Sequence, residues 1–279
     1  MKDELRREIS RTISQLENRD EGAFERLSEL FHRHSLKKTL CFTGPAGVGK
    51  SSLLSHLAKI AAEKKLVCWL ACDPSSPKTG GSLLGDRIRI SGQEVSKNIF
   101  IRSLSTRSQS AFSKAIRDIQ IYLEAYFDQI WVETAGTGQT QSDVSQISGL
   151  TVLILQPETG DEIQWMKSGI RECADIFVIN KADLAGAQSM AQSLIELGAA
   201  EDRVFLVSTK TRQGLRELLQ GLARVQENFQ WPERLKSMHE ALSRSLFLEM
   251  AAKRLESEFQ RGESLWLKNP YQAALKSKL

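Results

Sequence analysis

A glycine-rich octapeptide, Gly44 to Ser51, constrains this chain more than any other segment because of its neighbours. It has the spacing G-x-x-x-x-G-K-[ST], follows a largely apolar run at 39–42, and precedes apolar residues at helical spacing from Leu53 to Ile60. Glycines let backbone N–H groups turn inward around an anion, and the start of the next helix adds partial positive charge. A plain glycine-rich turn is the alternative. The strand before the loop and the Lys-Ser pair at its end favour a phosphate-binding loop instead.

Two side chains at the end of this loop have the chemistry that a nucleoside triphosphate needs. Lys50 can reach the outer phosphates, and the hydroxyl of Ser51 can bind Mg²⁺. The residues expected to line the phosphates are Gly44, Pro45, Ala46, Gly47, Val48, Gly49, Lys50, Ser51 and Ser52.

A second motif, Asn180-Lys181-Ala182-Asp183, follows the apolar run 176–179 and predicts which base is bound. Guanine presents an N1–H and an N2 amino group side by side, and one carboxylate, Asp183, can accept both bonds. Adenine has no such pair, so it would leave buried polar groups unpaired. Lys181 can lay its aliphatic stem across the ring. A helix cap is the alternative for Asp183 alone, but the position after a buried strand favours GTP and GDP. We also assign Ser208, Thr209 and Lys210 to the nucleotide site.

Short apolar runs alternate with amphipathic stretches from about 37 to 225, which predicts strands joined by helices. The strand candidates are Leu40–Thr43, Leu66–Cys72, Asn98–Arg102, Gln129–Glu133, Val152–Leu155, Ile176–Ile179 and Val204–Val207. Several are almost continuously apolar, as strands covered on both faces should be. The pattern therefore predicts an α/β fold, a doubly wound and mostly parallel sheet of the P-loop NTPase kind.

Helical patterns at both ends of the chain suggest three parts. We expect a helical extension at 1–36, a nucleotide domain at 37–228, and a C-terminal helical segment at 229–279. The end helices can simply cover the sheet. They can also form a partner surface, and Trp266 and Leu267, set among charged neighbours, favour a homodimer through the C-terminal arm.

Charge and composition narrow the class of partners. The chain has 279 residues, with 38 basic and 34 acidic side chains and a net charge of +4, and it contains no polybasic tract. We therefore expect no nucleic-acid partner. No apolar run approaches the ~20 residues of a membrane span, and the N-terminus does not resemble a secretory signal. The cysteines Cys41, Cys68, Cys72 and Cys173 fit buried free thiols better than a disulfide or zinc site, which suits a cytoplasmic protein.

Three acidic residues are candidates for magnesium binding and catalysis. Asp73 follows a predicted strand, at the sheet edge where α/β proteins bind ligands; an Asx turn before Pro74 is its alternative. Asp86 lies in a glycine-containing segment that can change shape when a phosphate leaves, with a helix N-cap as the alternative. Glu133 ends the apolar strand 129–133, and Gly136 can offer its N–H to the γ-phosphate.

The residue that orients the attacking water is not obvious from the sequence. Thr137 follows Gly136 where small signalling GTPases have glutamine, and Gln139 lies two residues further on. We therefore predict slow intrinsic GTP hydrolysis that a partner accelerates. Arg102 and Arg107 can stabilise phosphate charge, but solvation at the surface is the favoured interpretation.

These motifs together resemble the MeaB/ArgK family of GTPases, which includes the human protein of methylmalonic aciduria type A. The resemblance rests on segments that generic GTPases lack, and it extends over most of the chain. The matching segments are Asp73-Pro74-Ser75-Ser76-Pro77, Thr79-Gly80-Gly81-Ser82, Leu84-Gly85-Asp86, Gly160-Asp161-Glu162 and Asn180-Lys181-Ala182-Asp183.

The resemblance implies a G-protein chaperone for an adenosylcobalamin-dependent acyl-CoA mutase, typically methylmalonyl-CoA mutase or a relative. Such proteins gate cofactor loading and protect the mutase through GTP hydrolysis, and they are usually homodimers. By this likeness Lys50 and Ser51 bind phosphate and Mg²⁺, while Asp73, Asp86 and Glu133 serve the metal and catalysis.

Two other functions remain open from the residues alone. A nickel-insertion GTPase is disfavoured because the chain has only four scattered histidines, among them the pair His32 and His34. A P-loop small-molecule kinase is less favoured still, since it would have no use for a guanine-reading motif at 180–183.

Overall fold

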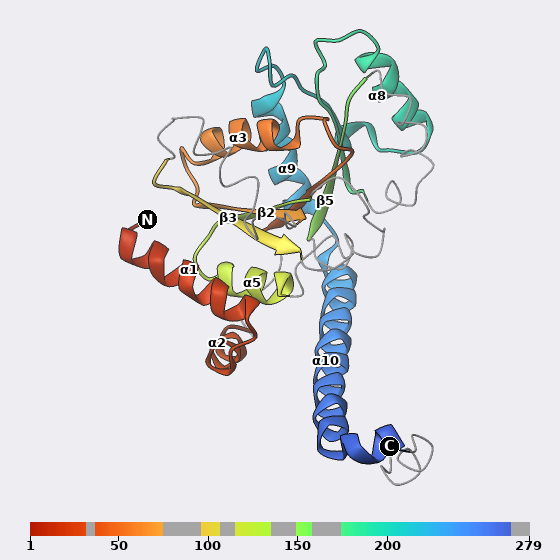
Figure 1. The fold of residues 1–279 in the computed structure, drawn as a ribbon. Helices are drawn as coiled ribbons and strands as arrows, with labels where there is room; N and C mark the ends of the chain where they lie inside the picture. Colours follow the sequence, from red (N-terminus) through yellow and green to blue (C-terminus); the bar gives the residue numbers. More distant parts are fainter. Residues whose placement is uncertain (32–36, 75–95, 107–114, 135–148, 158–173, 269–279) are drawn as a thin grey trace. The chain divides into compact units, whose positions relative to one another are not determined.

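Strands from across the chain form one parallel sheet in the computed structural model, which describes residues 1–31, 37–74, 96–106, 115–134, 149–157 and 174–268 (Figure 1). The strands are β1 (Thr39–Thr43), β2 (Val67–Pro74), β3 (Ile99–Thr106), β4 (Gln129–Glu133), β5 (Leu150–Leu155), β6 (Ile176–Ile179) and β7 (Val204–Leu206). The sheet has seven strands in the order β3-β2-β4-β1-β5-β6-β7, and every pairing in it is parallel. The predicted α/β class and all the predicted strands are confirmed.

The central strands are buried on both faces, which explains their near-continuous apolar sequence. Every residue of β1 and of β5 is buried. A parallel strand reaches its neighbour only through a crossover, and the crossover helices cover the faces of the sheet.

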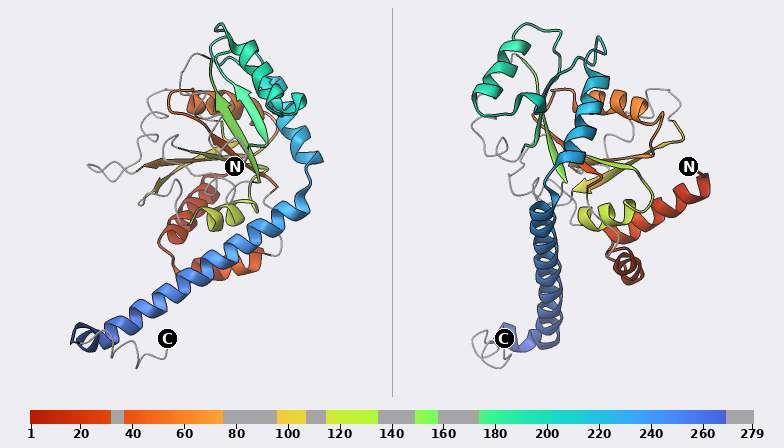
Figure 2. Two further views of the ribbon diagram at one scale, coloured as in Figure 1. Left: turned by 90° about the vertical axis from the view of Figure 1, so that its right-hand side faces the viewer. Right: turned by 180° about the vertical axis from the view of Figure 1, so that it is seen from behind.

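Helices lie on both sides of this sheet (Figures 1 and 2). The helices α3 (Lys50–Ala61) and α9 (Leu215–Asn228) pack on one face, where Leu53, Leu57, Leu218 and Leu222 join the strand side chains in one buried cluster. A second cluster joins α8 (Ala187–Glu196) to β5 and β6. The helices α1 (Asp3–Glu17), α2 (Glu21–Phe31) and α5 (Ile116–Leu123) form a layer on the face opposite α3.

The strand order places the phosphate-loop sequence at the centre of the sheet. β1 has β4 on one side and β5 on the other, and the chain leaves β1 directly into the glycine-rich segment. Ligands of open α/β sheets bind at the carboxyl ends of strands where the strand order reverses. The fold therefore gathers the ends of β1, β4 and β2 at one edge.

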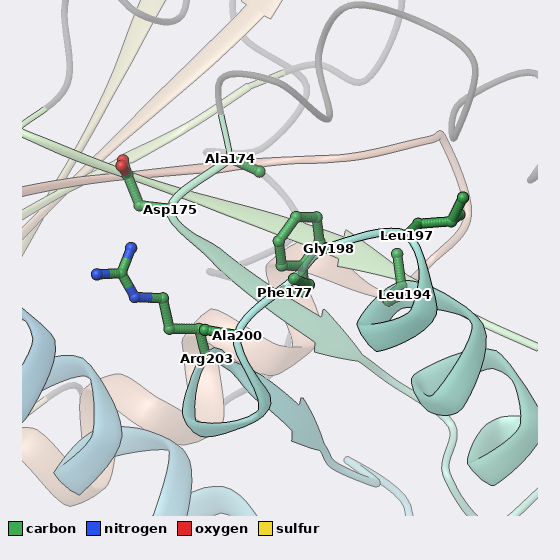
Figure 3. A pocket seen from close by; sticks show the side chains of 9 residues that line it. Ala174, Asp175, Phe177, Leu194, Leu197, Gly198, Ala200 and Arg203 are labelled. Atoms are coloured by element: carbon green, nitrogen blue, oxygen red, sulfur yellow. The ribbon is translucent and has the colours of Figure 1, made fainter.

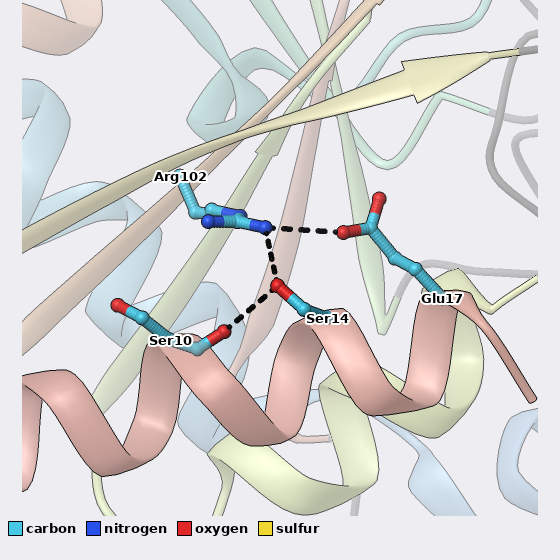
Figure 4. A network of polar contacts seen from close by, with 4 residues as sticks. All are labelled: Ser10, Ser14, Glu17 and Arg102. Atoms are coloured by element: carbon cyan, nitrogen blue, oxygen red, sulfur yellow. Dashed lines mark hydrogen bonds and ion pairs between the residues drawn. The ribbon is translucent and has the colours of Figure 1, made fainter. Parts of the chain in front are cut away.

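A polar contact fastens α1 to the outermost strand (Figure 4). Arg102 of β3 donates to the hydroxyl of Ser14 at 2.9 Å and pairs with Glu17 at 3.3 Å, while Ser14 donates to the carbonyl of Ser10. Arg102 thus contacts the first helix. The sequence alone allowed a role at the phosphates and favoured solvation at the surface, and the contact with α1 differs from both. Arg107 lies outside the described residues, as do His32 and His34.

The long helix α10 (Trp231–Lys268) begins in one compact unit, 1–235, and continues in a second, 236–279. Within the described part of the second unit, Phe247, Leu248 and Met250 are exposed. The division into 1–36, 37–228 and 229–279 stays a prediction. Among the described helices, none combines the length and apolarity that crossing a bilayer requires.

The described cysteines have the state expected of them. Cys41 and Cys68 are free thiols, and these two and Cys72 are buried in β1 and β2. Burial raises the pKa of the Cys41 and Cys68 thiols, so both stay protonated and unreactive at neutral pH. Cys173 lies outside the described residues.

Candidate nucleotide-binding site

Two glycines of the loop after β1 occupy positions that no other residue fits. Gly44 has φ of +146°, and a Cβ there would lie 2.1 Å from the carbonyl oxygen of Ile154 in β5. Gly49 has φ of +87°, and a Cβ there would meet the side-chain nitrogen of Asn180 at 2.6 Å. The loop is therefore held between β5 and the segment that follows β6, which is why its glycines are spaced as they are.

Substitution of Gly44 separates this steric contact from backbone strain. Gly44→Ala should lower the free energy of unfolding by about 3 kcal/mol, because strain at positive φ adds to a collision with backbone. Gly47 is the matched control: it has φ of +83° but no atom within 4 Å of its Cβ position. Gly47→Ala should cost about 1 kcal/mol. Urea unfolding without nucleotide measures both, and equal losses would contradict the close approach to Ile154.

Lys50 reaches back over the loop from the first turn of α3. Its Nζ donates to the carbonyls of Gly44 at 3.0 Å and Pro45 at 2.8 Å, and the residue is 7% exposed. Burial lowers the pKa of Lys50, while the nearby carboxylate of Glu133 acts in the opposite direction. The ammonium group therefore lies near the N-terminus of α3, which carries partial positive charge. The first turn of α3 has no acidic side chain to offset either charge.

A hydroxyl and a carboxylate meet at the end of the loop. The Ser51 hydroxyl donates to Oε1 of Glu133 at 2.5 Å, and the indole N–H of Trp69 donates to Oε2 at 3.1 Å. Glu133 ends β4 and is 4% exposed. Oxygen atoms of these two kinds are the ligands that Mg²⁺ prefers, so the donor set fits this ion.

The second motif touches the first directly. Asn180 is fully buried, and its side-chain nitrogen donates to the carbonyl of Val48 at 2.8 Å. Lys181, at a positive φ of 58°, donates to the carbonyl of Gly47 at 3.2 Å. The backbone N–H of Thr209 approaches the side-chain oxygen of Asn180 at 3.4 Å. Asn180 thus joins the glycine-rich loop to the segments after β6 and β7.

Asp183 is prepared to act as an ionised hydrogen-bond acceptor. The Ser208 hydroxyl donates to Oδ1 of Asp183 at 2.6 Å, and Lys210 lies 3.9 Å from Oδ2. The bond from Ser208 lowers the pKa of Asp183 most, and its own backbone N–H and the charges of Lys210 and Lys181 act in the same direction. Its side chain stays a carboxylate throughout the neutral range.

The structure brings together only part of the predicted site. Pro45, Ala46 and Ser52 lie in the loop and the start of α3, and Asp73 lies in the last two residues of β2, opposite Ser105 of β3. Asp86, Gly136 and Gln139 fall outside the described residues. Among described residues, no group of three or more His, Cys, Asp or Glu could hold a metal ion. Sequence reasoning missed Trp69, because an aromatic residue in a buried strand gives no sign of a polar contact.

A cavity of about 300 Å³ lies at the other edge of the sheet (Figure 3). Asp175 precedes β6 and Arg203 precedes β7, so the cavity is at the amino ends of strands, away from the glycine-rich loop. The Arg203 guanidinium points toward Asp175. Asp175 accepts bonds from Arg234 at 2.6 Å and from the Thr151 N–H at 2.8 Å.

Removal of Arg234 should give a pH-dependent loss of stability. Burial raises the pKa of Asp175, although Arg234 acts against it. Arg234→Met should therefore lower the free energy of unfolding by about 2 kcal/mol at pH 7, because a buried carboxylate loses its partner. A raised pKa in the folded state means that stability increases as pH falls and the group is protonated. The loss should shrink as pH falls from 7 toward 3.8, the ordinary value.

Arg216→Met is the control for this experiment. Arg216 pairs with Glu63 at 3.8 Å, and both side chains are more than half exposed. Exposed pairs contribute little, so this variant should match the parent at every pH. A loss for Arg234→Met that stays constant across pH would contradict the account of Asp175.

An all-parallel sheet with a G-x-x-x-x-G-K-S loop after β1 and an N-K-x-D motif after β6 defines a P-loop GTPase. The particular family follows from comparison with known proteins. The family model described as methylmalonyl Co-A mutase-associated GTPase MeaB matches residues 5–264. The chain belongs to the MeaB family, as the sequence motifs predicted.

Relatives agree with this assignment, and a solved structure shares the fold. A candidate GTPase of Pyrococcus abyssi is 39% identical over 93% of this chain and 81% of its own length. A mitochondrial methylmalonic aciduria type A homolog of Caenorhabditis elegans is 37% identical over 58% of this chain and 42% of its own length. The crystal structure of a LAO/AO transport system kinase covers 97% of this chain and 93% of its own, with a TM-score of 0.55 and 19% identity. At that identity the likeness shows the fold alone.

Proposed function

We propose that the edge at the carboxyl ends of β1, β4 and β6 binds Mg²⁺-GTP and hydrolyses it to GDP and phosphate. The contact between the two motifs supports this proposal most strongly. Asn180 donates to Val48 inside the phosphate-loop sequence, so the base-reading Asp183 and the phosphate-binding Lys50 belong to one site. Because the two motifs contact each other, one nucleotide can place its phosphates at the first motif and its base at the second.

Each described side chain of the site has a defined task in this proposal. Lys50 offsets charge on the outer phosphates, Ser51 and Glu133 hold Mg²⁺, and Asp183 accepts the paired guanine donors. The metal neutralises charge that develops on the phosphates. The remaining proposed contacts are Gly44, Pro45, Ala46, Gly47, Val48, Gly49, Ser52, Gly136, Asn180, Lys181, Ser208, Thr209 and Lys210 for the nucleotide, Asp73 and Asp86 for the metal, and Asp86 and Gln139 for catalysis.

We further propose that hydrolysis is slow in the isolated protein. Gln139 is two residues further from Gly136 than the water-orienting glutamine of small signalling GTPases. A partner that contributes a group to orient the attacking water would accelerate the reaction. Turnover at several per second by the purified protein alone would refute this part of the proposal.

The family description supports an adenosylcobalamin-dependent acyl-CoA mutase as that partner. In this proposal GTP hydrolysis gates cofactor loading and protects the mutase, and the protein acts as a cytoplasmic homodimer through 229–279. Exposed apolar residues of α10, including Phe247 and Met250, support the dimer because an apolar helix face is stabilised by a second copy. The proposed function involves no binding to nucleic acid or to a membrane.

The decisive experiment measures GTP turnover with and without a candidate mutase. We expect the mutase to accelerate hydrolysis at least tenfold and to co-purify with the intact protein. A catalytically dead control, Lys50→Ala, should show no acceleration. An unchanged rate, together with no complex in gel filtration, would contradict the chaperone role.

Competition between nucleotides separates the alternatives. A P-loop kinase would bind ATP. This site should retain GDP in a large excess of ATP, because adenine lacks the pair of N–H donors that Asp183 accepts from guanine. A nickel-insertion GTPase would bind GDP equally well. It would be distinguished by equilibrium dialysis with Ni²⁺, for which we expect no binding in this protein.

A further inference from the structure

We propose that Trp69 is a positioning residue that sets the magnesium site by fixing one oxygen of Glu133. The proposal rests on the function proposed above, in which Ser51 and Glu133 hold Mg²⁺. The indole N–H donates to Oε2 of Glu133 at 3.1 Å, while Oε1 accepts from Ser51 at 2.5 Å. The carboxylate is thereby oriented with a single oxygen toward the metal ligand Ser51.

The sheet register explains how Trp69 reaches this carboxylate. Trp69 of β2 stands opposite Trp131 of β4, and Glu133 is two residues further along the same face. The long indole of Trp69 spans this diagonal, since its N–H reaches Oε2 of Glu133 at 3.1 Å. Trp69 is 2% exposed and Glu133 is 4% exposed. A hydrogen bond to a charged group is stronger in such an enclosed setting than in water.

The neighbouring Trp131 shows that packing alone does not explain the contact. Trp131 is 1% exposed and packs edge-on against Phe42, with ring centroids 5.6 Å apart. Its indole nitrogen has no hydrogen-bond partner among the described residues. Burial of a tryptophan in this sheet therefore does not by itself require a hydrogen bond from its indole N–H to a carboxylate. The terminal torsion of a glutamate is broad, so Glu133 would turn more freely without a donor at Oε2.

A fixed carboxylate has a consequence for metal choice. Mg²⁺ requires a compact octahedral shell and takes one oxygen from a carboxylate, whereas Ca²⁺ accepts both oxygens at longer distances. With Oε2 held by Trp69, Glu133 offers Oε1 alone. Trp69 is thus a specificity-determining residue that favours Mg²⁺ over Ca²⁺.

The test compares Trp69→Phe with Trp131→Phe. The two changes remove the same atoms from residues that are register partners on β2 and β4. GDP affinity is titrated against Mg²⁺ and separately against Ca²⁺, with a fluorescent GDP analogue. Trp69→Phe should raise the Mg²⁺ concentration needed for half-maximal affinity about tenfold, the effect of losing one charge-assisted hydrogen bond. The Ca²⁺ concentration needed for half-maximal affinity should stay unchanged or fall. Trp131→Phe should stay within twofold of the parent for both ions.

Further measurements keep the outcomes distinct. Urea unfolding of both variants checks folding, and replacement of Trp69 by 3-benzothienylalanine removes the N–H while keeping the ring volume. Equal metal profiles for this analogue and the parent would overturn the proposal. If the parent binds no GDP at any Mg²⁺ concentration, the proposed function fails. If it binds GDP and Trp69→Phe matches Trp131→Phe, only the role of Trp69 fails.

Discussion

Lys50→Ala should lower the affinity for GTP and GDP about 100-fold while leaving the sheet folded. A bond from an ammonium group to phosphate is worth roughly 1.5–3 kcal/mol, and Lys50 is expected to serve two phosphates. The fold should tolerate the change because the carbonyls that accept from Lys50, those of Gly44 and Pro45, belong to the loop after β1 and not to the sheet. Calorimetric titration with GDP measures the affinity, and urea unfolding measures the fold.

Lys59→Ala is the control on the same helix. Lys59 lies in the last turn of α3 and is exposed, so its removal changes the net charge equally without touching the loop. It should bind GDP like the parent. If Lys50→Ala also binds like the parent, the phosphate assignment is wrong. If both variants lose affinity alike, the effect comes from overall charge.

Asp183→Asn should reduce GTP affinity about 100-fold and turn the preference toward xanthosine nucleotides. A carboxylate accepts from both guanine donors, whereas an amide offers one acceptor and places a donor against the 2-amino group. Xanthine has a carbonyl at that position and accepts the amide proton. The bond from Ser208 can remain, because the amide oxygen still accepts it. Competition of GTP and xanthosine triphosphate for one fluorescent GDP analogue measures the change.

Asp202→Asn is the matched control, since Asp202 is an exposed aspartate before β7. It should keep the parent's preference for guanine. Loss of GTP affinity in Asp183→Asn with no gain for xanthosine nucleotides would mean that Asp183 supports the loop through Ser208. In that case the carboxylate would not read the base.

The elements of the sheet could be predicted because their signals are local. Strands such as 129–133 and 176–179 have the predicted bounds, since a strand buried on both faces needs an uninterrupted apolar run. The glycine-rich loop was equally readable, because Gly44 and Gly49 have positive φ and no room for a Cβ. The C-terminal helical pattern after Trp231 also became one helix, α10.

The contacts between distant segments could not be predicted in this way. Arg102 has the same sequence signal whether it faces phosphate, solvent or α1, and only the packing of α1 beside β3 decides in favour of Ser14 and Glu17. Trp69 likewise resembles any core residue of a strand. Its bond to Glu133 depends on β2 pairing with β4 in one register.

The sequence by itself determined the family, the parallel sheet and the two nucleotide motifs, because each depends on residue types at fixed short spacing. The tertiary structure alone decided that Asn180 holds Val48, that Ser208 holds Asp183, and that Trp69 and Ser51 share the oxygens of Glu133. These bonds join residues from 25 to 132 positions apart. Strand order and register bring such residues together, and a local pattern carries no information about either.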